Sequence, residues 1–294
     1  LFDEYYKEDF DNLKKLDSGE MIPLNFDDKK EKMIVAFIKD DGPINYYFYD
    51  RIKKKATFLF ESSPDLKKYK LAHMEPISYK SRDGLEIHGY LTLPINKAKN
   101  LPLVLNVHGG PIVRDCWGYN SEAQWLSNRG YAVLQVNYRG STGYGKKFLN
   151  LGDREWGGKM HDDLIDAVNW AIDSGIADKN KIAIYGGSYG GYAALCGATF
   201  TPDVFCCAVD IVGPSNLVTL LKSFPPDWEA GLPGFYKRVG HPEKDKEFLE
   251  SRSPLFKVDC IKIPLLIAQG KHDPRVKEAE AQQIVDALKA KNIA

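Results

Sequence analysis

The segment KIAIYGGSYGGYAALCGATF (181–200) decides the fold: a short apolar run ends in a glycine-rich turn, and a helical stretch follows directly. Within the turn, Gly186, Ser188 and Gly190 form a G-x-S-x-G pattern. A serine at such a turn needs strained backbone angles and close packing of helix on strand, so glycines flank it. A glycine-rich turn can match five letters by chance. Strand, turn and helix together favour an exposed nucleophile at Ser188, facing a helix N-terminus.

Short apolar runs alternate with helical periodicity on both sides of this segment. The runs are typical of strands buried on both faces, and they span 103–107, 131–137, 181–186, 206–212 and 264–270. Helical spacing of apolar residues predicts a helix around 162–172, with Asp162 and Asp163 in its first turn, and another over 276–289. Strands that alternate with helices predict a mostly parallel, doubly wound α/β sheet.

The N-terminal part of the chain has a different pattern. Three β-rich runs separated by turn residues predict an up-and-down meander, at 33–39, 44–52 and 56–62. So small a meander buries too little surface to be stable alone, so we expect it to belong to a larger β structure such as a propeller. From Pro76, two alternating strands joined by Asp83-Gly84 predict an edge hairpin. We therefore expect a β-rich segment over 1–75 and an α/β domain over 76–294.

The composition excludes several classes of partner. Lys plus Arg and Asp plus Glu both total 40, so no net charge attracts nucleic acid or an acidic membrane surface. The five cysteines form no C-x-x-C pair and no zinc-ligand spacing, so reduced thiols and a cytoplasmic location are expected. The sequence contains no apolar run long enough to predict a membrane span. Because residue 1 is Leu, we interpret the chain as a piece of a longer one.

Two further loops supply candidate catalytic groups. His108-Gly109-Gly110-Pro111 follows an expected strand and is similar to loops that lend a backbone N–H to an oxyanion hole, with Gly110 and Tyr189 as the expected donors. Asp273 follows the last expected strand, at the sheet edge where α/β active sites form, and comes after Ser188 as the acid of a triad should. In isolation, an ordinary glycine turn and an ordinary Asp-Pro turn remain the alternatives for these loops.

Four motifs together resemble the prolyl oligopeptidase family of serine peptidases, especially its acylaminoacyl-peptidase branch: VHGGP (107–111), NYRGSTGYG (137–145), GGSYGGY (186–192) and QGKHDPRV (269–276). The similarity covers roughly residues 20–290. In that family a β-propeller precedes an α/β-hydrolase domain, so the resemblance implies that residues 20–75 are its last strands. It also implies hydrolysis of short peptides through an acyl-enzyme on Ser188, without a metal or an organic cofactor.

The resemblance assigns roles to individual residues. It makes Ser188 and Asp273 the catalytic pair and gives the oxyanion hole to the backbone N–H groups of Gly110 and Tyr189. Substrate binding falls to a second set: Tyr189, Val212 and Val276 around the residue before the scissile bond, and Arg275 at a substrate carbonyl. Leu217 and Trp228 either join this pocket or pack in the core. The tract 137–145 is interpreted as structural support beside the site.

The general base is missing from this assignment. A serine nucleophile needs a histidine hydrogen-bonded both to the serine and to the acid, and none of the six histidines fits. His108 belongs to the oxyanion loop, and His272 is the immediate neighbour of Asp273, where side chains on an extended segment point to opposite sides. We therefore expect the histidine on a further strand and loop beyond Ala294, and little activity from the 294 residues alone.

Two other functions remain open. A carboxylesterase is built on the same fold, since a fold does not fix a function. A non-catalytic binding module that lost its histidine would carry the same motifs. For a peptidase, release of acylated residues, of dipeptides or of internal fragments are the alternatives, and a homodimer is compatible with the edge hairpin.

Overall fold

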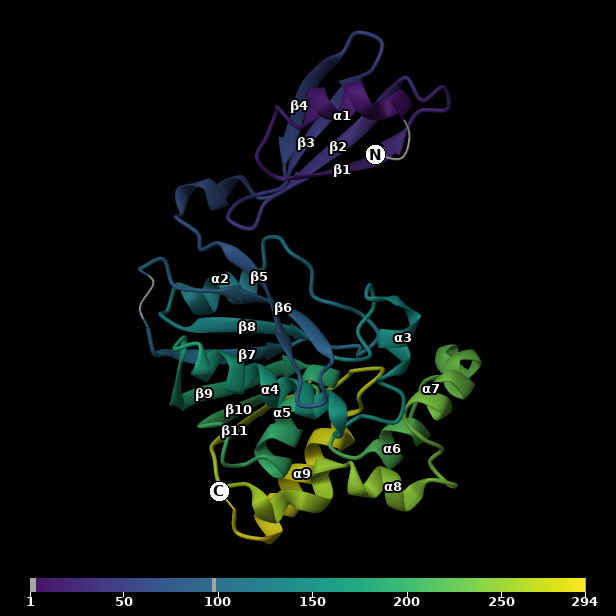
Figure 1. Ribbon diagram of the computed structural model, residues 1–294. Helices are drawn as coiled ribbons and strands as arrows, with labels where there is room; N and C mark the ends of the chain where they lie inside the picture. Colours follow the sequence, from purple (N-terminus) through teal and green to yellow (C-terminus); the bar gives the residue numbers. More distant parts are fainter. Residues whose placement is uncertain (1–3, 97–98, 294) are drawn as a thin grey trace.

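The chain forms two separate β-sheets (Figure 1). The computed structural model describes residues 4–96 and 99–293. The first sheet is antiparallel, with the order β1-β2-β3-β4. Its strands are β1 (Glu20–Phe26), β2 (Lys32–Ile38), β3 (Asn45–Asp50) and β4 (Lys55–Glu61). The last three correspond to the three predicted β-rich runs.

A short helix completes this N-terminal unit. After η1 (Glu4–Tyr6), α1 (Lys7–Leu13) packs on the sheet, and Leu13 is fully buried with a small core from β2 and β3. The buried Asp9 of α1 accepts hydrogen bonds from Arg51 Nε (2.8 Å) and Tyr49 Oη (3.1 Å). An ion pair so well desolvated ties the helix to β3 and its following turn.

The edge strand β4 leaves large apolar side chains in solvent. Phe58, Leu59 and Phe60 are all exposed. Such an edge is a surface on which further β structure can assemble. The interpretation of residues 1–75 as the end of a propeller stays a prediction.

The second sheet has seven strands in the order β11-β10-β9-β7-β8-β6-β5. Its strands are β5 (Met74–Lys80), β6 (Glu86–Thr92), β7 (Leu101–Val107), β8 (Ala132–Asn137), β9 (Ala177–Gly187), β10 (Cys207–Ile211) and β11 (Leu265–Ala268). Strands β7 to β11 are parallel, and the β5–β6 hairpin joins antiparallel. The mostly parallel sheet and its edge hairpin are thus confirmed, with β5 starting two residues before the expected boundary at 76.

The strand order reverses direction between β7 and β9. The chain passes from β7 to β8 on one side and then crosses back to β9 on the other side of β7. Loops that leave these two strands therefore diverge, and ligands of open α/β sheets bind at such a switch point. The loops in question are those after Val107 and after Gly187.

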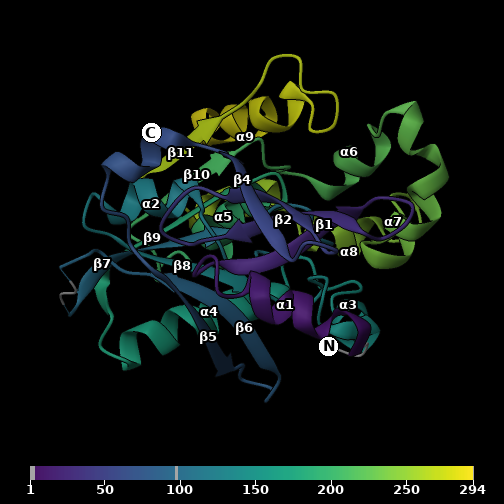
Figure 2. The ribbon, with the colours of Figure 1, turned by 90° about the horizontal axis from the view of Figure 1, so that it is seen from above.

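Helices flank the large sheet (Figures 1 and 2). The α-helices are α2 (Ser121–Ser127), α3 (Gly145–Asn150), α4 (Lys159–Asp173), α5 (Tyr189–Phe200), α6 (Leu217–Lys222), α7 (Leu232–Arg238), α8 (Lys246–Ser251) and α9 (Glu278–Ala290). Three further 3-10 turns are η2 (Pro64–Lys68), η3 (Pro226–Gly231) and η4 (Pro254–Cys260). Helix α5 is buried almost all round, between the sheet and η4. Within the described residues, no helix is both long and apolar enough to cross a bilayer.

A polar junction links the two sheets. The side chain of Gln124, on α2, donates to Asp40 O (3.1 Å) in the β2–β3 loop and to Ala72 O (2.7 Å) in the connecting segment. The carboxylate of Asp40 accepts from Met74 N (2.8 Å), the first residue of β5, and lies 3.2 Å from His73 Nδ1. These contacts fix where the chain passes from the small sheet into the large one.

Candidate active site

Ser188 occupies a strained turn between β9 and α5. Its φ of 57° and ψ of −118° lie outside the regions that L-residues ordinarily occupy. Two hydrogen bonds hold this conformation: Ser188 N donates to Ile211 O (2.9 Å), and Ser188 O accepts from Tyr192 N (3.0 Å). The serine itself is exposed. Strand, turn and helix therefore present the hydroxyl above the sheet, as the sequence predicted.

Glycine is required at this turn because backbone approaches backbone. A Cβ on Gly190 would lie 2.0 Å from Val107 O, and one on Gly186 would lie 2.6 Å from the same oxygen. Real Cβ atoms do not come that close to a carbonyl oxygen, so any side chain here would separate α5 from the end of β7. The turn is thus packed directly on the strand that carries the oxyanion loop.

The predicted oxyanion loop lies against the nucleophile turn. Val107, the last residue of β7, is paired with Gly186, and a Cβ on Gly109 would lie 3.4 Å from Ser188 Cβ. Gly110 follows at φ 108°, a conformation that favours glycine. Tyr189 N–H is the first amide of α5, one of those that a helix leaves without an intrahelical acceptor. Gly110, Ser188 and Tyr189 are therefore brought to the same edge of the sheet, on adjacent loops.

His108 is held inside its own loop. Its Nδ1 lies 2.8 Å from Gly109 O, its Nε2 lies 3.1 Å from Ser141 Oγ, and its ring stacks on Tyr138 with centroids 4.5 Å apart. Burial lowers the pKa of His108 to about 4, although the hydrogen bond to Gly109 acts in the opposite direction. The imidazole is thus neutral at pH 7 and engaged away from Ser188, which fits a structural role.

Asp273 lies on the loop after β11, at the same edge of the sheet. Its Oδ1 accepts from Arg275 N (2.8 Å) and Val276 N (2.9 Å), so the loop itself fixes the carboxylate. With β10 between β9 and β11, two strand spacings of about 4.8 Å separate the ends of these strands. Ser188 and Asp273 therefore lie on loops that leave the same edge of the sheet, two strands apart. Of the histidines, all within the described ranges, none hydrogen-bonds to Ser188 or Asp273.

The predicted substrate-binding residues surround this edge. Val212 follows β10 at φ 49°, between the Ser188 turn and the Asp273 loop, and its N–H donates to Ala268 O (2.8 Å). Val276 is buried, and Arg275 is exposed beside it. Leu217 is completely buried in the core, so core packing describes it. Tyr189 is also nearly buried, and its ring packs among Tyr138, Trp156 and Tyr192.

An aromatic cluster stands next to Arg275. The guanidinium of Arg275 lies 5.0 Å from the ring centroid of Trp228. Trp228 in turn stacks on Phe235 at 5.5 Å and meets Phe224 edge-on at 5.1 Å. Sequence reasoning left Trp228 undecided between pocket and core. The half-buried ring is positioned by its aromatic neighbours and carries a cation on its face.

One buried carboxyl group beneath the site was not predicted. Asp210, near the end of β10, is fully buried, and its Oδ1 accepts a hydrogen bond from Gly213 N (2.7 Å). The same oxygen lies so close to Gly191 that a Cβ on Gly191 would be 2.2 Å from it. Its Oδ2 has no hydrogen-bond partner in the part of the chain that the structure describes. Burial raises the pKa of Asp210 to about 7, against the effect of the Gly213 N–H. An aspartate inside the apolar run CCAVDIV was the available signal.

This carboxyl group predicts a pH-dependent stability. Between an ordinary pKa of 3.8 and a folded-state pKa of about 7, the folded chain keeps the proton and the unfolded chain loses it. The free energy of unfolding therefore falls as the pH rises through this window, by about 4 kcal/mol. Asp210→Asn should flatten the profile and raise stability at pH 8, with no gain near pH 4. Urea unfolding across this range measures it, with exposed Asp227→Asn as the control; parallel profiles for wild type and Asp210→Asn would contradict the expectation.

The fold and the site define a class of protein. A mostly parallel sheet with a serine on a strained strand-to-helix turn, and a glycine loop beside it, is the α/β-hydrolase architecture. Comparison with known sequences narrows this class. The sequence model of the prolyl oligopeptidase family matches residues 117–294, and the chain belongs to that family.

Individual relatives agree with this assignment. The chain is 50% identical to dipeptidyl aminopeptidase BIII of Pseudoxanthomonas mexicana over 306 residues, covering 100% of this chain and 44% of the relative. It is 41% identical to dipeptidyl peptidase family member 6 of Caenorhabditis elegans, covering 96% of this chain and 41% of that protein. The acylaminoacyl peptidase of Pyrococcus horikoshii superposes with a TM-score of 0.80 at 26% identity, covering 93% of this chain and 44% of that structure. The chain thus spans less than half the length of these relatives.

Proposed function

We propose that these residues form the catalytic part of a serine peptidase that cleaves short peptides through an acyl-enzyme on Ser188. The observation that carries the proposal is the exposed serine on a strained turn, packed against a glycine loop. Family membership supports the same chemistry.

The reaction is acyl transfer. Ser188 Oγ attacks the peptide carbonyl carbon, and its proton passes through the general base to the departing amine. The N–H groups of Gly110 and Tyr189 donate hydrogen bonds to the oxyanion of the tetrahedral intermediate. Fixed donors stabilise the transition state most when they face the atom on which negative charge develops. Water then attacks the ester carbonyl and releases the acid. Asp273 orients the general base, a histidine that we propose lies beyond residue 294.

For the substrate we propose an oligopeptide with a free N-terminus, from which a dipeptide is released. The names of the two relatives described above, both dipeptidyl peptidases, support this choice. Release of an acylated residue is the second candidate, supported by the acylaminoacyl peptidase that shares the fold. Arg275, Val212 and Val276 would contact the residues before the scissile bond.

Three substrates compared on one protein test this proposal. The protein used is the chain extended through the next strand and histidine, and its two main substrates are a dipeptidyl anilide with a free N-terminal amine and the N-acetylated form of the same anilide. We expect kcat/KM for the free-amine anilide to be about 10-fold or more above kcat/KM for the N-acetylated one. The reverse order would favour release of acylated residues. A simple ester as control separates the carboxylesterase alternative, because an esterase would leave both anilides essentially uncleaved.

The N-terminal unit and the assembly are proposals of their own. We propose that the sheet β1–β4 is the last part of a β-propeller, with the exposed residues of β4 covered by a neighbouring blade. The edge hairpin β5–β6 is the basis for proposing a homodimer. The free thiols are the basis for proposing a cytoplasmic location. Sedimentation of the complete protein would test the dimer.

A further inference from the structure

We propose that Arg139, clamped between Asp163 and Asp83, is the positioning residue for the oxyanion loop. This inference rests on the proposed peptidase function and assigns a task to the tract 137–145, which otherwise has only a supporting role. Three links carry it: an ion-pair cluster, a short turn, and His108.

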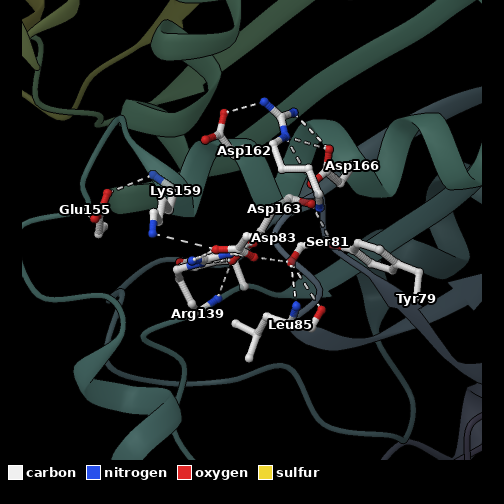
Figure 3. A network of polar contacts seen from close by, with 12 residues as sticks. Tyr79, Ser81, Asp83, Leu85, Arg139, Glu155, Lys159, Asp162, Asp163 and Asp166 are labelled. Carbon is white, nitrogen blue, oxygen red and sulfur yellow. Dashed lines mark hydrogen bonds and ion pairs between the residues drawn. The ribbon is translucent and has the colours of Figure 1, made fainter.

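The first link is a buried guanidinium with two bidentate partners (Figure 3). Arg139 Nε and Nη2 donate to the two oxygens of Asp163 on α4, at 2.9 and 2.7 Å. Arg139 Nη1 and Nη2 donate to Asp83 in the β5–β6 turn, at 2.8 and 2.9 Å. The backbone N–H of Arg139 also donates to Asp163 Oδ2 (2.9 Å). Side chain and backbone of one residue are thus fixed by one carboxylate.

The charges of this cluster are balanced. Lys159 Nζ lies 3.8 Å from Asp83, so two cations face two carboxylates. Arg139 holds the pKa of Asp83 below its usual range, and Asp163 is completely buried. Bidentate, charge-assisted bonds are directional, and lysine cannot reproduce them. The cluster therefore sets a position and does not merely neutralise charge.

The second link is the turn that surrounds Arg139. Ser141 N donates to Tyr138 O (3.0 Å), and Ser141 Oγ donates to the same oxygen (2.7 Å). These bonds close residues 138–141 into one compact turn. Since Arg139 lies inside it, anchoring Arg139 to α4 and to the hairpin anchors the whole turn.

The third link joins the turn to the oxyanion loop. Tyr138 Oη donates to His108 O (3.0 Å), Ser141 Oγ lies 3.1 Å from His108 Nε2, and the rings of Tyr138 and His108 are stacked. The turn thus holds the loop by the backbone and by the side chain of His108. Gly109 and Gly110 follow immediately, so a displaced turn would displace the proposed N–H donor of Gly110. Losing one such donor lowers kcat by about 10²–10³, and a misplacement of about 1 Å by about 10².

The same elements carry a matched control. Arg82, in the same β5–β6 turn, pairs with Asp162 (2.9 Å) and Asp166 (2.8 Å) on α4. This cluster joins the same hairpin to the same helix, but it is more exposed and its bonds do not reach the 138–141 turn. If the substitutions acted only by lowering stability, changes in either cluster would lower activity alike. If Arg139 positions the oxyanion loop, only changes in the Arg139 cluster would lower activity.

The experiment compares Arg139→Lys with Arg82→Lys, and adds Asp83→Asn in case Arg139→Lys does not fold. In a chain extended through its histidine, Arg139→Lys should lower kcat about 10- to 100-fold, with KM changed less than about 2-fold. Asp83→Asn should have a smaller effect in the same direction, and Arg82→Lys none. Unchanged kcat in Arg139→Lys and Asp83→Asn, or an equal loss in Arg82→Lys, would overturn the proposal.

A second readout does not depend on activity. In the 294-residue chain, the ¹⁵N signals of the His108 imidazole should shift in Arg139→Lys and stay in place in Arg82→Lys. If the extended chain cleaves no substrate, the peptidase proposal fails, and these signals alone decide the positional role. Unchanged His108 signals in a folded Arg139→Lys protein would overturn it.

Discussion

In a chain extended through its histidine, Ser188→Ala is expected to abolish covalent labelling by a fluorophosphonate and to lower kcat by about 10⁶. Ser188 Oγ is the atom that would form the bond to the substrate carbonyl, and alanine offers no nucleophile in its place. The loop geometry should survive, because the strained turn is held by backbone hydrogen bonds to Ile211 and Tyr192. Mass spectrometry of the labelled protein identifies the modified residue.

Ser121→Ala, at an exposed serine in α2, is the matched control and should label like the wild type. A label on another residue, or turnover retained in Ser188→Ala, would contradict the assignment of the nucleophile. The 294 residues without the extension should turn over an activated ester only very slowly. An ordinary enzymatic rate that Ser188→Ala abolishes would show instead that the general base lies within these residues.

The large sheet was predictable because its strands are short apolar runs bounded by turns. All five parallel strands lie in the predicted runs, within a few residues at each end, because burial on both faces leaves little room for polar residues. The turn at Ser188 was predictable for a steric reason, since only glycine fits beside Val107 O. Sequence and structure agree wherever one local requirement admits few residue types.

Elements with weak local signals were missed. Strand β1 contains Pro23 and exposes most of its length, so no alternating pattern appears in EMIPLNF. Helix α1 has seven residues and buries only Asp9 and Leu13, which is too short a stretch for helical periodicity to be visible. Strand β1 is stabilised by pairing with β2, and α1 by packing on the small sheet. Local propensity does not indicate such tertiary contacts.

Long-range polar partners were also beyond sequence reasoning. Asp163 was interpreted as a first-turn acid that favours the helix dipole, but its carboxylate is buried on Arg139, 24 positions away. The charged residues of the Arg139 cluster come from a hairpin turn, a loop and a helix. Only the fold brings them together, so neither spacing nor composition could indicate the pairing.

Gly190→Ala is expected to lower the free energy of unfolding by about 3 kcal/mol or more. The new Cβ would lie 2.0 Å from Val107 O and 3.0 Å from Val107 C, both backbone atoms that no rotamer change can move. Either α5 separates from β7 or the turn at Ser188 opens. Gly234→Ala in α7 is the control, because an added Cβ would meet nothing within 4 Å beyond its own helix backbone and chain neighbours, and alanine favours a helix by about 1 kcal/mol.

Chemical unfolding of both variants measures the difference, and equal stability of Gly190→Ala and Gly234→Ala would contradict it. The effect should extend to chemistry. Val107 immediately precedes His108, so a Gly190→Ala protein that still folds must shift the oxyanion loop relative to Ser188. In a chain extended through its histidine, fluorophosphonate labelling should then slow in Gly190→Ala and stay normal in Gly234→Ala, because the glycine that allows the helix to pack also sets the distance between nucleophile and oxyanion donors.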